Sequence, residues 1–125
     1  MGLAFMSEET WVPNKLTLIS TWDGDEVSLT RLAWTLRATR RLPIAERADQ
    51  LAQILSSIGE VSGEGLYRVV ECDDAEDWQR DLLKAGFRVD SAGAQALRFA
   101  PALNVSAETL DRLEAAVEAA AGGRA

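Results

Sequence analysis

The sequence contains no histidine and only one cysteine, Cys72. Zinc and copper sites are built mainly from these two residue types, so the usual ligand sets for both metals are excluded. A single cysteine also excludes an internal disulfide, and no histidine is present to activate Cys72 as a nucleophile. We therefore expect Cys72 to be a small buried side chain and the protein to hold no metal.

Long hydrophobic runs and an excess of positive charge are missing as well. The 13 Lys and Arg residues are outnumbered by 20 Asp and Glu residues, and a net charge of −7 repels polyanions, which argues against DNA or RNA as a partner. The apolar start MGLAFM (1–6) is too short to span a membrane and lacks the basic residues of a signal peptide. We expect a cytoplasmic protein without a membrane anchor, in which this start packs on the body or on a partner.

What is present is a globular composition: 125 residues, of which 47% are hydrophobic and 26% are charged. A chain of this size can bury one core without disulfides or metals. The helical period of apolar side chains indicates four helices, beginning near residues 26, 43, 73 and 106. Aromatic and β-branched residues indicate strands at 66–72, 87–90 and 96–100, and residues 11–20 favour an extended lead-in.

The expected fold class is α+β, with a small sheet of three to four strands covered on one face by about four helices. Asp25 is the expected N-cap of the first helix, Asp73 and Glu76 form a capping box for the third, and Gly86 should end the third. The glycines of GEVSGEG (59–65) predict a break after the second helix. We divide the chain into an N-terminal extension (1–11), a domain (12–121) and a frayed tail (122–125).

Two separated stretches occur in the same order as two motifs of a known family: STWDGD (20–25) before the first helix and ALRFAPAL (96–103) before the last. They resemble the S-T-aromatic-G-G-N loop and the R-F-x-P-P-L segment of the C-terminal small domain of class III (fold type I) pyridoxal-phosphate aminotransferases, in particular the lysine 6-aminotransferase branch. The resemblance covers residues 12–121 and implies the small-domain fold of that family.

In that family the threonine of the first motif reaches the cofactor phosphate of the neighbouring subunit. The resemblance therefore implies a phosphate contact at Ser20 and Thr21, ahead of a helix N-terminus. This sequence departs from the motif, because Asp23 and Asp25 stand where the family has a glycine and an asparagine. Carboxylates repel a phosphate, and the alternative interpretation is that these acids cap the helix that follows.

Arg98 in the second motif matches the family arginine that binds a substrate carboxylate, usually that of glutamate or 2-oxoglutarate. A planar guanidinium suits this task because it meets a carboxylate with two hydrogen bonds. The strand pattern alone favours an alternative, in which Leu97 and Phe99 face the core and Arg98 points to solvent. The motif is otherwise retained except at Ala102, where the family has a second proline.

The family's large domain, with its Schiff-base lysine, has no counterpart in this sequence. The chain has two lysines, Lys15 and Lys84, and neither corresponds to the lysine that forms the imine. Whether the protein is an enzyme is left open, because the isolated chain should not transaminate but a partner subunit could supply what is missing. Pyridoxal phosphate is expected only if a large-domain partner completes the site.

Three functions remain open at this point. The first is a stand-alone small domain that binds another protein or associates with itself; Trp34, off the apolar side of its helix, indicates a surface for such a partner. The second is the small-domain subunit of a split class III aminotransferase. The third is a sensor in which Arg98 holds an amino acid or keto acid such as a small dicarboxylate.

Overall fold

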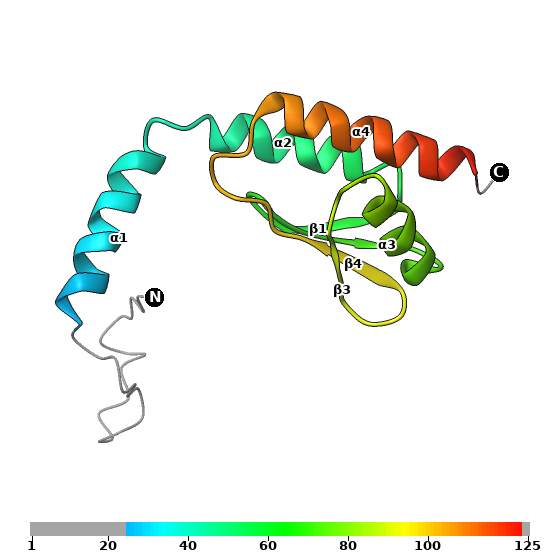
Figure 1. The fold of residues 1–125 in the computed structure, drawn as a ribbon, viewed down its shortest axis with the longest axis horizontal. Helices are drawn as coiled ribbons and strands as arrows, with labels where there is room; N and C mark the ends of the chain where they lie inside the picture. Colours follow the sequence, from blue (N-terminus) through cyan, green and yellow to red (C-terminus); the bar gives the residue numbers. More distant parts are fainter. Residues whose placement is uncertain (1–24, 124–125) are drawn as a thin grey trace, which may run out of the picture. The chain divides into compact units, whose positions relative to one another are not determined.

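The structure is a computed structural model that describes residues 25–123. The chain divides into two compact units between Arg41 and Leu42 (Figure 1). The predicted boundaries of the domain at residues 12 and 121 stay a prediction. The expected extended lead-in at 11–20 lies outside the described residues, as do Ser20, Thr21 and Asp23.

Helix α1 (Glu26–Thr39) is the described helix of the first unit. Asp25 is its N-cap, as predicted: the carboxylate accepts hydrogen bonds from the backbone N–H groups of Val27 and Ser28, both at 3.2 Å, and from the Ser28 hydroxyl. The hydroxyl bond and then the backbone bonds hold the pKa of Asp25 below its ordinary value. No residue of α1 is buried.

The second unit contains the remaining elements: α2 (Ile44–Leu55), β1 (Val61–Glu64), β2 (Tyr67–Glu71), α3 (Ala75–Lys84), β3 (Asp90–Ser91), β4 (Ala96–Phe99) and α4 (Ala107–Gly122). The strands form one antiparallel sheet in the order β1-β2-β4-β3. Within this unit α2 contacts β1, α3 contacts β3 and β4, and α4 packs on both helices. Figure 1 shows α2 and α4 running side by side along the sheet. The α+β class, with four helices and four strands among the described residues, is as predicted.

The core of the second unit is apolar and continuous from the helices to the sheet. Its fully buried side chains are large and aliphatic: Leu51, Leu55, Val70, Leu82, Leu97, Leu110 and Val117. Cys72 is also buried, as predicted. None of the helices in residues 25–123 is long and apolar enough to cross a bilayer.

The ends of α4 and α3 can be compared with their predicted signals. Ser106 caps α4, since its hydroxyl accepts from the Thr109 N–H at 3.1 Å. Gly86 ends α3 at φ +89°, as predicted, and the N–H groups of Gly86 and Phe87 donate to Leu83 and Leu82 in a Schellman arrangement. α4 continues through Gly122.

Two local predictions for α3 were wrong. Its N-cap is Asp74, not Asp73, and Asp74 adopts a left-handed backbone (φ 56°) with no side-chain capping bond. The expected capping box is therefore absent at the start of this helix. Ala85 is exposed because it is the C-cap residue, where the chain leaves the helix.

Two strand predictions also need correction. The GEVSGEG stretch is not simply a break: it contains β1, which pairs with β2 from Val61 opposite Val70 to Glu64 opposite Tyr67. The strand expected at 87–90 is instead β3 at Asp90–Ser91. The backbone before β3 is engaged elsewhere, since the Phe87 N–H closes the end of α3 and the Val89 carbonyl accepts from Gln79 at 2.7 Å.

Candidate functional site

The candidate site is the sheet face of the second unit that its helices do not cover. Side chains alternate between the two faces along each strand. Val70, Leu97 and Phe99 point to the helices and are buried. The opposite set, which we call the open face, consists of Ser62, Glu64, Tyr67, Val69, Glu71, Asp90, Ala96 and Arg98.

Arg98 lies on the open face between two strands that both contact it. Asp90 stands directly opposite Arg98 in the β3–β4 ladder, and Arg98 Nη2 donates to Asp90 Oδ2 at 2.6 Å. The prediction that Leu97 and Phe99 face the core while Arg98 points outward is confirmed. The arginine that the resemblance assigns to a carboxylate is thus bonded to a carboxylate of its own chain.

The electrostatics of the pair follow from this geometry. The hydrogen bond from Arg98, followed by its positive charge, holds the pKa of the Asp90 carboxyl below its ordinary value, and the charge of Arg88 acts in the same direction. Hydrogen bonds with Asp90 and then Tyr67 raise the pKa of Arg98. Both partners are well exposed, with 43% of the Arg98 side chain and 57% of the Asp90 side chain open to solvent. A ligand carboxylate would have to displace Asp90 to reach the guanidinium.

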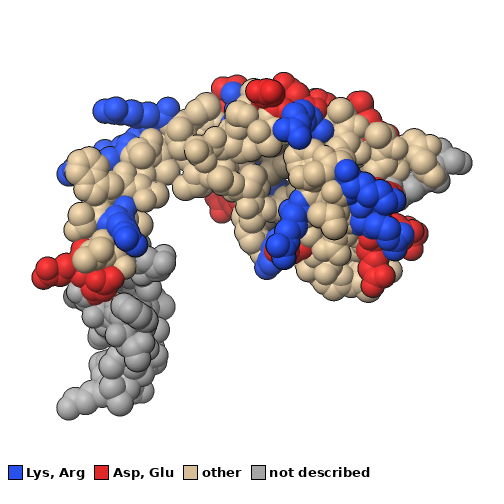
Figure 2. Space-filling model, in the orientation of Figure 1, with Lys and Arg blue, Asp and Glu red and all other residues tan. Residues whose placement is uncertain are grey.

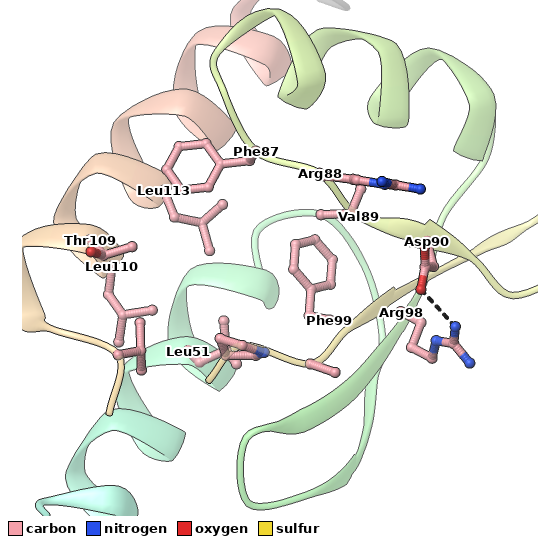
Figure 3. A pocket seen from close by; sticks show the side chains of 13 residues that line it. Leu51, Phe87, Arg88, Val89, Asp90, Arg98, Phe99, Thr109, Leu110 and Leu113 are labelled. Carbon is pink, nitrogen blue, oxygen red and sulfur yellow. Dashed lines mark hydrogen bonds and ion pairs between the residues drawn. The ribbon is translucent and has the colours of Figure 1, made fainter. Parts of the chain in front are cut away.

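A cavity of about 170 Å³ lies beside this pair and is lined by α2, the segment before β3, β4 and α4. Most of its lining is apolar and comes from Leu51, Phe87, Val89, Phe99, Pro101, Val105, Leu110 and Leu113. Figure 3 shows the Asp90–Arg98 pair at the edge of the cavity, with the guanidinium directed away from Phe99 and Leu113. The cavity can take one small apolar group, because an apolar cavity of about 150 Å³ holds a benzene molecule. Arg98 does not point into it.

The described residues do not fit pyridoxal phosphate. Lys84, the lysine within residues 25–123, lies on the exposed surface of α3 and pairs with Asp81 at 2.9 Å. It does not line the cavity beside Arg98. The predicted phosphate contacts at Ser20 and Thr21 lie outside the described residues. No step of cofactor chemistry is therefore assigned to this part of the chain.

Metal binding has no site among the residues that the structure describes. No group of three or more His, Cys, Asp or Glu side chains there is arranged to hold an ion. Cys72 is buried at the end of β2, and its backbone N–H donates to the Gln95 carbonyl at 2.9 Å.

Two contacts of the site were not found from the sequence. Asp90 was expected at the end of a strand, but its pairing with Arg98 depends on the register of a hairpin whose ends were predicted incorrectly. Tyr67 was placed on a strand without a role. A signal exists in principle, since outward positions on adjacent strands become neighbours once the register is known.

Comparisons with known proteins give matches among solved structures. No protein-family model and no curated protein matches the sequence. A mutant of M. tuberculosis Rv3290c is 27% identical, with a TM-score of 0.68 over 87% of this chain and 28% of that one. The lysine aminotransferase from M. tuberculosis in the internal aldimine form is 24% identical, with a TM-score of 0.59 over 75% of this chain and 23% of that one.

An omega transaminase 6-fold mutant from Pseudomonas jessenii is 18% identical, with a TM-score of 0.57 over 66% of this chain and 22% of that one. The matches under 25% identity show the fold alone. The chain spans only about a quarter of the length of these solved structures. The protein is therefore an aminotransferase-like small domain, similar in fold to part of the class III pyridoxal-phosphate aminotransferases.

Proposed function

We propose that this aminotransferase-derived domain is not catalytic by itself and acts by binding a protein. The observation that carries the proposal is helix α1. It has 14 residues and no buried side chain, yet Leu29 and Leu36 on one side of the helix are about half exposed, and Val27 and Trp34 on the other side are more than half exposed. A helix of this length is marginal in water unless an apolar face is covered, and clustered apolar surface is typical of interaction sites.

The geometry around Arg98 supports the non-catalytic part of the proposal. The Arg98 guanidinium is hydrogen-bonded to Asp90. Lys84 pairs with Asp81 on the surface of α3 and does not line the cavity. An enzyme that transfers amino groups through pyridoxal phosphate needs a lysine that forms the imine. On this proposal Arg98 no longer binds a substrate, and its role is to pair with Asp90 across β3 and β4 on the sheet surface.

The proposed function can be tested with the tagged full chain in its own host. Partners are captured with the wild-type protein, with Trp34→Ala in α1 and with Leu83→Ala, a matched change at an exposed leucine of α3. We expect a defined protein, or a second differently tagged copy, to be captured by the wild type and by Leu83→Ala, and lost with Trp34→Ala. Equal recovery with all three variants would count against α1 as the binding element.

A second candidate function is a subunit of a split class III aminotransferase. It is favoured by the match to about a quarter of the length of complete aminotransferases. A captured complex that contains a large-domain protein and absorbs at roughly 400–430 nm, where a pyridoxal imine absorbs, would support it. In such a complex Arg98→Gln should raise the KM for a dicarboxylate substrate. A colourless complex with an unrelated protein would exclude the split aminotransferase and support the protein-binding function.

A further inference from the structure

We propose that the cavity beside the Asp90–Arg98 pair is a binding site for a small aromatic carboxylate, whose ring fills the cavity while its carboxylate meets Arg112 and the Thr109 hydroxyl on α4. The inference goes beyond the proposed function, because it concerns the second unit alone and holds whether or not α1 binds a protein. It rests on the apolar walls of the cavity, on the backbone bonds that fix its opening, and on the charge beside that opening.

The inner walls of the cavity are apolar and belong to the core. They come from α2, the segment before β3, β4 and α4, and each is at most 8% exposed: Leu51, Val89, Phe99, Leu110 and Leu113. These side chains offer water no hydrogen bonds, so an apolar group that fills the space is stabilised by leaving water. The volume of about 170 Å³ suits one phenyl ring, since benzene binds in an apolar cavity of about 150 Å³.

The cavity reaches solvent where its lining is only partly buried. The residues of this kind lie on α4 and in the loops beside it: Phe87, Pro101, Val105 and Thr109. Figure 3 shows Phe87 and Thr109 on the α4 side of the cavity, with Phe99 across from them. A ligand whose ring lies on the inner walls therefore has its other end at this opening.

Backbone hydrogen bonds fix the residues around the opening. The Val105 N–H donates to the Ala102 carbonyl at 2.9 Å, which closes the loop before α4. The Phe87 N–H donates to the Leu82 carbonyl at 2.8 Å, which ties the segment before β3 to the end of α3. The opening is thus formed before a ligand arrives, and binding orders few further groups.

Arg112 places a positive charge beside the opening. It follows Thr109 by three residues, so its side chain lies about 60° around α4 from that of Thr109. Its guanidinium carbon is 5.8 Å from the centroid of the Phe87 ring, which lines the cavity. Glu108 lies one turn before Arg112, but Arg112 forms no ion pair with it or with another residue of the described range. The guanidinium can therefore meet an anion at the opening.

Thr109 adds a hydroxyl to the lining. Its Oγ1 lies 2.9 Å from Ser106 Oγ, and either atom can donate in this contact. When Ser106 donates, the proton of the Thr109 hydroxyl is left for a ligand oxygen. A carboxylate accepts from both the hydroxyl and the guanidinium, whereas an ammonium group is repelled by Arg112. These two groups select a carboxylate as the polar end of the ligand.

The other two arginines of the lining do not provide this anchor. Arg98 is hydrogen-bonded to Asp90 and is directed away from the cavity. The Arg88 guanidinium is directed away from Phe87 in Figure 3. The proposed site is therefore distinct from the arginine that the sequence resemblance assigns to a carboxylate.

The test titrates the full chain, labelled with nitrogen-15, with three compounds that share a phenyl ring and differ in charge: phenylacetate, benzyl alcohol and benzylamine. Shifts of amide signals in NMR spectra locate each compound and give its Kd. Arg112→Gln removes the charge, and Arg31→Gln on α1 is its matched control. Val105→Phe fills the opening, and Val27→Phe makes the same change at an exposed valine of α1.

We expect phenylacetate to shift the amides of Val89, Phe99 and Leu110 with a Kd on the order of 1 mM, as a ligand of about ten non-hydrogen atoms allows. Benzyl alcohol should bind roughly tenfold more weakly, and benzylamine more weakly again, because of the charge of Arg112. In Arg112→Gln only phenylacetate should weaken, by roughly tenfold, whereas a distorted cavity would weaken benzyl alcohol as well. Val105→Phe should abolish binding of both, and the two α1 controls should bind as the wild type does.

An absence of shifts at the cavity residues in about 20 mM phenylacetate would overturn the inference. Equal affinities for phenylacetate and benzylamine would overturn it too, because the site would then not select a carboxylate. Shifts confined to Asp90 and Arg98 would do the same by placing the ligand on the sheet arginine. The proposed function fails separately, if α1 variants lose no protein partner.

Discussion

Asp90 and Arg98 face each other across the β3–β4 hairpin, with Asp90 Oδ2 accepting from Arg98 Nη2 at 2.6 Å. The arginine is the residue that the resemblance assigns to a substrate carboxylate, and the aspartate is a carboxylate of the chain itself that binds the same guanidinium. An internal pair of this kind lowers the affinity for an external anion, because the ligand must first displace a tethered competitor.

Replacing the internal competitor should reveal whether the anion site is retained. We expect Asp90→Asn to bind 2-oxoglutarate more tightly than the wild type, because Arg98 then lacks an opposing charge. Thermal unfolding with millimolar 2-oxoglutarate measures this as a larger rise in Tm, since a ligand that binds the folded state stabilises it. The control is Asp90→Asn combined with Arg98→Gln, which should show no rise. Equal shifts in both variants would place the ligand elsewhere.

The titration of Asp90 should depend on Arg98. The folded-state pKa of Asp90 lies below the ordinary value of an aspartate, so the stabilising contribution of the charged carboxyl is complete above that ordinary value and is lost as the pH falls through the lower, folded pKa. In Arg98→Gln the positive charge and its charged hydrogen bond are removed, so the pKa of Asp90 should rise toward the ordinary value of an aspartate. Carbon-detected NMR titration of the Asp90 carboxyl compares the two proteins. An unchanged pKa in the variant would show that the pair does not form in solution.

Two adjacent leucines of α3 provide a matched test of the core. Leu82 is fully buried, whereas Leu83 is 59% exposed. We expect Leu82→Ala to lower the free energy of unfolding by about 2–5 kcal/mol, through lost burial and the cavity left behind. Leu83→Ala should change it by no more than about 0.5 kcal/mol. Urea denaturation followed by circular dichroism measures both. Similar losses in the two variants would contradict the orientation of α3.

The helices were predicted well because each carries its own periodicity and end signals. In the last helix Leu110, Leu113, Val117 and Ala120 recur at helical spacing, and all four are buried. Their spacing depends only on the geometry of a helix, which is the same in any context. Asp25 and Ser106 act as caps for the same local reason.

The strands and the site partners were predicted less well, because sheet structure depends on residues far apart in sequence. β1 has two residues between its end and the start of β2, and its glycine-containing sequence has low strand propensity; pairing with β2 makes it a strand. Asp74 precedes α3 in a left-handed conformation, which glycine adopts more readily than aspartate, so residue preferences alone did not predict it. The Asp90–Arg98 contact required the register, which the hairpin sequence alone did not fix.

Gly63 in β1 and Gly65 in the β1–β2 turn provide the last test. Both have positive φ, +94° and +56°, so an alanine at either position is strained. A Cβ at Gly63 would lie 2.4 Å from the Tyr67 carbonyl oxygen, whereas a Cβ at Gly65 would meet no atom within 4 Å.

We expect Gly65→Ala to cost about 1–2 kcal/mol from backbone strain alone. Gly63→Ala should cost clearly more, because β1 must also move away from β2, the strand that carries Tyr67 on the open face. Urea denaturation gives the two losses, and amide hydrogen exchange at Val69 reports whether β1 has separated. If Gly63→Ala were the milder change, the pairing of Gly63 with Arg68 would be wrong, and with it the position of Glu64 on the open face.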